Sequence, residues 1–118
     1  MLPVVCGLAV AFAAGCSSLK SPATTDVAVT NAAVESAVSA GGSEFAPVEM
    51  NAARSKLALA RKALESKDYK LAISLADQSR ADAKLAQGKA NSAKARAAAD
   101  TLEEDIQILR NEIKRNNP

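Results

Sequence analysis

Apolar residues recur at alternating intervals of three and four along most of this chain, which is the spacing of amphipathic helices. The clearest example follows Pro47, a residue suited to the first position of a helix. Met50, Leu57 and Leu64 then recur every seven residues with alanines between them, so one apolar stripe faces one side. This pattern predicts a helix over residues 47–66.

A second and much longer helix is predicted over residues 68–115. Asp68 can cap its first turn through the side-chain carboxylate. Apolar residues, nearly all of them alanine, continue the same spacing from Tyr69 to Ala97. Gly88 costs about 1 kcal/mol relative to alanine in a helix interior and does not have to break the helix. A continuous helix of this length spans about 70 Å, at about 1.5 Å per residue.

The apolar stripe of this long helix changes direction near residue 100. Four bulky aliphatic residues then follow at spacings of four, three and four: Leu102, Ile106, Leu109 and Ile113. The preceding helix is too short to cover them, and such a face is unfavourable in water, so we expect a partner interface, such as a coiled coil between copies. Alternatively, residues 26–40 cover the stripe, or the chain folds back at Gly88. A capping box of Thr101 and Glu104 also leaves open a new helix start near Asp100.

A shorter helix is predicted over residues 26–40, where valines recur among alanines and serines. Gly41-Gly42 ends this helix, and residues 43–46 are expected to form a turn. The predicted fold is all-α. It is a helical hairpin with a short N-terminal helix and a long C-terminal helix able to form a coiled coil, in one domain over residues 26–118.

The beginning of the chain differs from the rest. A dense apolar run over residues 4–14 is too short to span a membrane and ends in small residues before Cys16. This arrangement resembles the lipobox of bacterial lipoproteins, which implies that residues 1–15 are a cleaved signal peptide and that Cys16 carries lipid. A buried apolar helix with an ordinary core cysteine is the alternative. Residues 16–25 are small and polar and contain Pro22, so they predict a flexible, lipidated tether.

The lipobox implies a location in the bacterial cell envelope, with the lipid on Cys16 inserted in a membrane. Cys6 would leave with the signal peptide, so no disulfide would be available to the mature chain. In enterobacteria an aspartate after the lipidated cysteine resembles an inner-membrane retention signal. Ser17 stands there, which favours the outer membrane, with the helices facing the periplasm.

Charge is segregated along the chain although the net charge is only +2. Residues 50–99 hold eleven Lys or Arg and four Asp or Glu, whereas the segments on either side are acidic. Arg54, Lys56, Arg61 and Lys62 form a candidate basic surface for peptidoglycan or another anionic envelope polymer. A solvated helix surface is the simpler alternative.

The residues needed for common catalysis are missing. The chain has no histidine, its cysteine would be consumed by lipid, and Gly41-Gly42 lacks the flanking pattern of a phosphate-binding loop. We therefore expect no enzyme, no cofactor and no metal site. Nucleic-acid binding is also not expected, because the basic segment lacks stacking aromatic residues and export would separate it from nucleic acid.

Two segments of the sequence resemble known families. The segment from Ala63 to Ala83 resembles one tetratricopeptide turn, but arrays need about three units, so it indicates only a shared way of packing helices. Residues 41–98 resemble a family of short proteobacterial lipoproteins described as a domain of unknown function. The residues that carry this second resemblance are Gly42, Phe45-Ala46-Pro47, Ala53, Leu57, Asp68-Tyr69 and the alanines from Ala76 to Ala83. The resemblance implies an envelope role and an association with OmpA-like proteins, and it supplies no catalytic residues.

The expected function is that of a cell-envelope lipoprotein acting as a non-enzymatic structural or interaction module in the periplasm. It would associate with itself or bind an envelope partner, such as peptidoglycan or an OmpA-like protein. The alternative is a binding module that holds an anionic envelope polymer through a basic surface over residues 54–96.

Overall fold

The computed structural model describes residues 18–117, and within this range every regular element is a helix. The helices are α1 (Lys20–Ser39), α2 (Gly42–Phe45), α3 (Pro47–Glu65) and α4 (Tyr69–Asn116). This confirms the all-α prediction and the long C-terminal helix. Observed α3 and α4 lie within one residue of the predicted bounds at each end.

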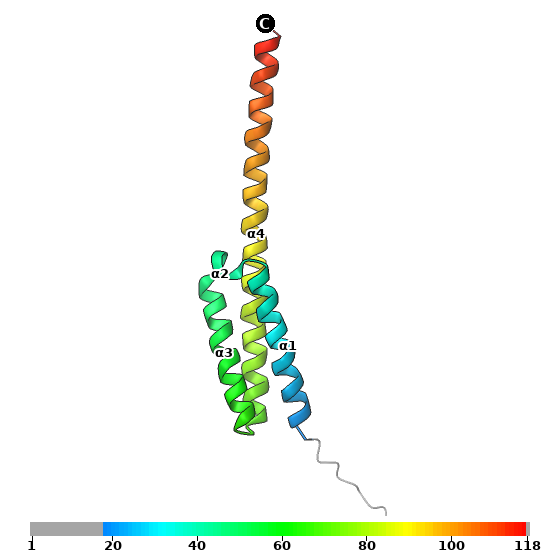
Figure 1. Cartoon of the computed structure of the whole chain (residues 1–118), viewed down its shortest axis with the longest axis vertical. Coiled ribbons are helices and arrows are strands. Elements are labelled where there is room, and N and C mark those ends of the chain that lie inside the picture. Colours follow the sequence, from blue (N-terminus) through cyan, green and yellow to red (C-terminus); the bar gives the residue numbers. More distant parts are fainter. Residues whose placement is uncertain (1–17, 118) are drawn as a thin grey trace, which may run out of the picture.

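The first half of α4 packs against both α1 and α3, so the hairpin of α3 and α4 is completed by a third long helix (Figure 1). The last buried residue of α4 is Ala90. Beyond it, residues 91–116, here called the stalk, continue straight out of the bundle (Figure 1). The start of α1 and the turn between α3 and α4 lie at the opposite end, here called the base.

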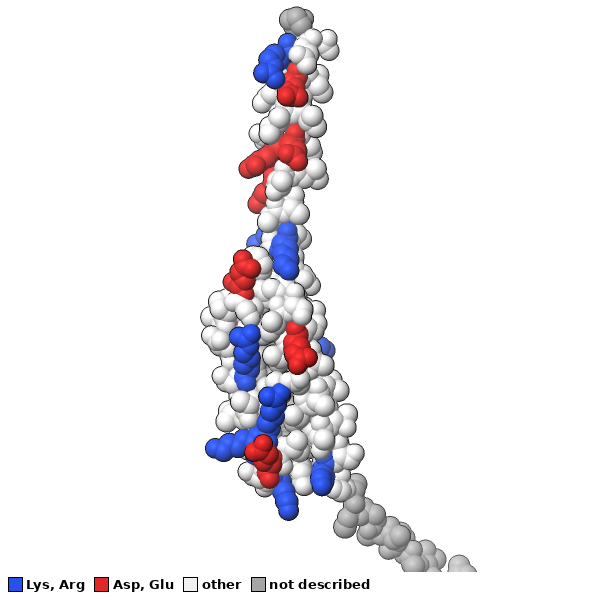
Figure 2. All heavy atoms as spheres, in the orientation of Figure 1, with Lys and Arg blue, Asp and Glu red and all other residues white. Residues whose placement is uncertain are grey.

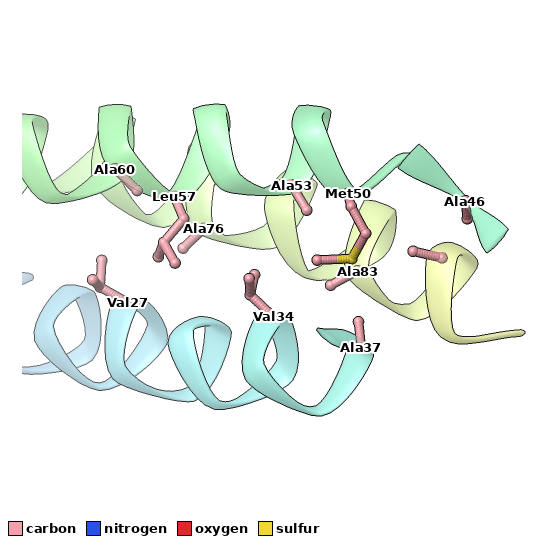
Figure 3. Packing of buried hydrophobic residues seen from close by; sticks show 11 residues of the cluster. Val27, Val34, Ala37, Ala46, Met50, Ala53, Leu57, Ala60, Ala76 and Ala83 are labelled. Atoms are coloured by element: carbon pink, nitrogen blue, oxygen red, sulfur yellow. The ribbon is translucent and has the colours of Figure 1, made fainter. Parts of the chain in front are cut away.

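The core between the three long helices is built mainly from alanine. Fully buried alanines occur on all three of them, and only a few larger side chains fill the space between (Figure 3). Those larger side chains are Val27 and Val34 from α1 and Met50 and Leu57 from α3. Because alanine adds so little volume, the helix backbones can approach closely, as the sequence pattern indicated.

Two buried hydroxyl groups form hydrogen bonds between the helices, which alanine side chains cannot do. The Oγ1 of Thr30 in α1 donates a hydrogen bond of 3.1 Å to the carbonyl of Ala76 in α4. The Oγ of Ser79 in α4 donates one of 2.6 Å to the carbonyl of Ala53 in α3. Both side chains are fully buried, so their hydroxyls are satisfied inside the core.

The structure corrects the predicted start of α1. This helix begins at Lys20, so residues 20–25 of the predicted tether are helical. Pro22 is tolerated because it lies in the first turn, where backbone N–H groups have no acceptor within the helix. Ala23 is fully buried in a cluster with Ala63 and Ala72, which fixes this turn to the base of the bundle. Cys16 lies outside the described residues.

The link between α1 and α3 is tighter than the predicted turn. Residues 43–46 were expected to form a turn, but Gly42–Phe45 makes one helical turn, α2. Gly41 has a φ of 91°, which favours glycine. A side chain at Gly42 would place its Cβ 2.7 Å from the carbonyl oxygen of Ala37, so glycine is needed there for close packing.

Helix α4 is continuous, as predicted. The Oδ1 of Asp68 accepts a hydrogen bond of 3.2 Å from the backbone N–H of Leu71, which is the expected cap. Gly88 lies within the helix and faces open space. The capping-box alternative is wrong, because the Oγ1 of Thr101 donates to the carbonyl of Ala97, one turn back in the same helix.

Candidate functional site

The aliphatic stripe of the stalk is uncovered. Its four residues are between 41% and 63% exposed: Leu102, Ile106, Leu109 and Ile113. The two alternatives that would have covered them are wrong, since α1 packs against the first half of α4 and the chain does not fold back at Gly88. Every described residue beyond Ala93 is exposed.

The stripe faces a different direction from the part of α4 that packs in the bundle. Leu102 follows Ala90 by twelve residues, which at 3.6 residues per turn places them about 120° apart around the helix axis. The stripe is therefore not a simple extension of the bundle core. Ile108, which is 58% exposed, lies outside the stripe and was missed by sequence reasoning, because it does not share the spacing.

The four predicted basic residues have different neighbours in the structure. An Nη of Arg54 donates a hydrogen bond of 2.9 Å to the Oγ of Ser43 in α2. An Nη of Arg61 donates to the Oδ1 of Asn31 in α1. On the other edge of α3, the Nζ of Lys56 forms an ion pair of 2.7 Å with Asp82 in α4.

The fourth of these cations, Lys62, lines a shallow groove at the base. Figure 2 shows that basic and acidic side chains are interspersed over the visible face of the bundle. Acidic side chains gather instead partway along the stalk, where Glu103, Glu104 and Asp105 follow one another (Figure 2).

A second ion pair joins α3 and α4 near the upper end of the bundle. The Nζ of Lys89 donates to Oε1 of Glu49. This hydrogen bond holds the pKa of the Glu49 carboxyl below its ordinary value. Sequence reasoning could not pair these residues, which lie 40 positions apart.

Two grooves mark the surface of the bundle. The upper one, of about 590 Å³, is lined by Phe45, Lys84, Leu85, Gly88, Lys89, Ser92, Ala93 and Arg96. Its lining holds three cations and no carboxylate, although Lys89 is paired with Glu49. The lower groove, of about 410 Å³, is lined by Leu59, Lys62, Ala63, Ser66, Asp68, Leu71 and Leu75. Neither groove was predicted, because each combines residues of helices that meet only in the fold.

Chemistry beyond these surfaces is sparse in the described part of the chain. Residues 18–117 contain no group of three potential ligands placed to hold a metal ion. Of the helices described, none has both the length and the apolar character needed to cross a membrane. The main features of the described surface are therefore the exposed stalk stripe and the upper groove.

The fold and these surfaces define a small helical protein with a helical bundle and one projecting helix. A family model, "Domain of unknown function (DUF4398)", matches residues 25–102, and the chain belongs to this family. The match begins at Thr25, within α1, and ends at Leu102, so Ile106, Leu109 and Ile113 lie beyond it. No curated protein and no solved structure gives a significant match.

Proposed function

We propose that this protein is a lipid-anchored, non-enzymatic interaction module of the proteobacterial cell envelope. The single observation that carries the interaction role is the bare aliphatic stripe on a stalk that no described helix covers. Bulky aliphatic residues gathered on one exposed face are typical of a binding surface. The lipobox-like sequence ending in Cys16 supports the anchor.

The position of the base suits such an anchor. Helix α1 begins at Lys20, four residues after Cys16, and its start lies at the end of the bundle away from the C-terminus (Figure 1). Lipid on Cys16 would therefore hold the base close to the membrane. With 48 residues, α4 is about 70 Å long at 1.5 Å per residue, so the stripe would stand well away from the lipid surface.

The remaining parts of the proposal rest on sequence resemblance. Ser17 supports the outer membrane, with the bundle in the periplasm. An OmpA-like protein or peptidoglycan is an envelope partner of the kind that the resemblance implies. A second copy of the chain is the other partner that the stripe suits.

Intact-mass spectrometry of protein extracted from membranes tests the anchor. We expect a chain that begins at Cys16 and carries acyl groups, found in the outer-membrane fraction. Replacing Cys16→Ser should remove the acyl mass and release the helical part from the membrane or leave the precursor unprocessed. An unmodified chain that still begins at Met1 would overturn the anchor.

A second candidate function is favoured by the upper groove. Lys84 and Arg96 have no ion-pair partner among the described residues, and exposed Phe45 lies beside them. Such a groove could hold an anionic envelope polymer, with the cations on its charges and the ring against its apolar parts. This is a narrower surface than the predicted one over residues 54–96.

Binding to purified peptidoglycan sacculi across a salt series tests this second function. Retention should weaken as salt rises, because salt screens exposed charges. The variant Lys84→Gln with Arg96→Gln should be retained less than the matched variant Lys67→Gln with Lys70→Gln, which removes two cations at the base. Equal retention of both variants would exclude the groove as the binding site.

A further inference from the structure

We propose that the stalk pairs with the stalk of a second copy of this chain as a parallel, in-register, two-stranded coiled coil. The proposal deepens the interaction role given above by naming the partner and its orientation. It rests on the proposed function only for the effect of a shared membrane.

The stripe belongs to a longer repeat than its four bulky residues. Ala95 and Ala99 precede Leu102 at spacings of four and three, so the alternation runs from Ala95 to Ile113 without a break. Both alanines are exposed. In a coiled coil these positions are the seam, called a and d, with Leu102 and Leu109 at d. The whole seam lies beyond Ala90, where the bundle ends.

The identity of the seam residues favours two parallel strands. Ile106 and Ile113 occupy a, and Leu102 and Leu109 occupy d. Isoleucine at a with leucine at d is the combination that favours parallel dimers over larger assemblies. The alanine layers nearer the bundle allow the two helices to approach closely as they leave it.

The charges beside the seam also favour the parallel orientation. Asp105 and Arg110 flank the seam at the g and e positions, and neither has an ion-pair partner among the described residues. In a parallel pair, Asp105 of one copy lies beside Arg110 of the other, and the contact forms twice. An antiparallel pair would bring Asp105 near Glu112, which sets like charges together.

The bundle leaves room for this partner. The seam at Leu102 is turned about 120° around the helix axis from Ala90, which shares the buried face of α4, the helix that packs against α1 and α3. A second stalk on the seam therefore lies away from these two helices. The stalk also gains from pairing, because most helical stability in proteins comes from packing, and every described residue beyond Ala93 is exposed.

A seam of this length gives modest affinity by itself. If both copies carry lipid in the same membrane, their effective concentration rises and pairing becomes stronger without any new contact. A shared membrane also places both bases on one side, which only the parallel orientation satisfies.

Disulfide crosslinking tests the pairing and its orientation. The full chain, with Cys6→Ser and Cys16→Ser and kept in mild detergent, receives one new cysteine at Leu102, Ile113 or Asn111. Parallel pairing predicts that Leu102→Cys and Ile113→Cys each form a disulfide-linked dimer alone under mild oxidation. Asn111→Cys lies on the outer face of the coil and is the control. We expect about tenfold less dimer from it, since a disulfide needs Cα atoms within about 7 Å.

Three results would overturn the proposal. Dimer formed only when Leu102→Cys and Ile113→Cys are mixed would establish an antiparallel pair. Equal dimer from Asn111→Cys would indicate random collisions, and no dimer from any variant would exclude pairing. Because these chains carry no lipid, the outcome is independent of the mass measurement on Cys16, and each proposal can fail alone.

Charge exchange gives a second test. Asp105→Arg should reduce the dimer measured by sedimentation, because it places like charges beside Arg110 of the partner. Adding Arg110→Asp restores both the attraction and the net charge, so the double variant should recover the dimer. Loss of the dimer in both variants would contradict the parallel contact.

Discussion

At the scale of single residues, two glycines of this chain have opposite roles. Gly42 is buried where α1 turns toward α3, and an added Cβ would also lie 2.9 Å from the sulfur of Met50. Gly88 lies in α4 with no atom within 4 Å of such a Cβ. The first glycine is required by packing, whereas the second only lowers the helix propensity of α4.

This contrast predicts opposite changes in stability. Gly42→Ala should lower the free energy of unfolding by about 1–3 kcal/mol, because the new methyl group overpacks the core. Gly88→Ala should raise it by up to about 1 kcal/mol through helix propensity. Urea unfolding followed by circular dichroism measures both. A stabilising effect of Gly42→Ala would show that the close approach to Ala37 is absent.

The ion pair between Glu49 and Lys89 gives a prediction about pH. Since the hydrogen bond from Lys89 lowers the pKa of Glu49, the pair's contribution to stability is present above the ordinary glutamate pKa. That contribution is lost as the pH falls through the lowered folded-state pKa. Carboxyl NMR should find the pKa of Glu49 raised toward its ordinary value in Lys89→Gln. An unchanged pKa in this variant would exclude Lys89 as the cause.

At the scale of elements, the helix bounds could be predicted from local sequence wherever a capping residue or a proline is compatible with only one position in a helix. Pro47 is the first residue of α3, as predicted. Asp68 caps the first turn of α4, also as predicted. Pro22 was misleading, because a proline that would break a helix interior is harmless in a first turn. The buried contact of Ala23 extends α1 upstream, and only the folded bundle reveals that contact.

Some parts of the candidate site could likewise be predicted from the sequence, and others could not. The stripe from Leu102 to Ile113 was found in the sequence, because it depends on spacing within one helix. The partners of the basic residues were not found, since those of Arg61 and Lys56 come from different helices that lie far away in the sequence. The upper groove depends on Phe45 meeting α4, which spacing alone does not indicate.

The bundle and the stalk should also differ in their share of stability. At concentrations where the full chain is monomeric, deleting residues 98–118 should change the free energy of unfolding by no more than about 0.5 kcal/mol, as expected for exposed residues. Deleting residues 82–118 instead removes buried Ala83, Ala86 and Ala90 and should unfold the bundle. Chemical denaturation of both truncations measures this. Strong destabilisation by the shorter deletion would place the stalk within the folding unit.

At the scale of the whole molecule, helix α4 belongs to both the bundle and the stalk. The same α4 that buries its alanines between α1 and α3 carries the exposed stripe farther along, and no break separates the two regions (Figure 1). Gly88 and Asp100, near which the sequence left a break in the helix open, both lie within regular helix.

Because α4 is uninterrupted, the bundle and the stalk are connected by regular helix and not by a flexible joint. A sideways pull or a twist applied at the tip of α4 is transmitted along the helix to the contacts that Ala76 and Ser79 make with α1 and α3. Those contacts are buried hydrogen bonds and close alanine packing, which tolerate little sliding. Mechanical load at the far end would therefore reach the upper end of the bundle first, where Ala86 and Ala90 are buried, and only then the hydrogen bonds at Ser79 and Ala76.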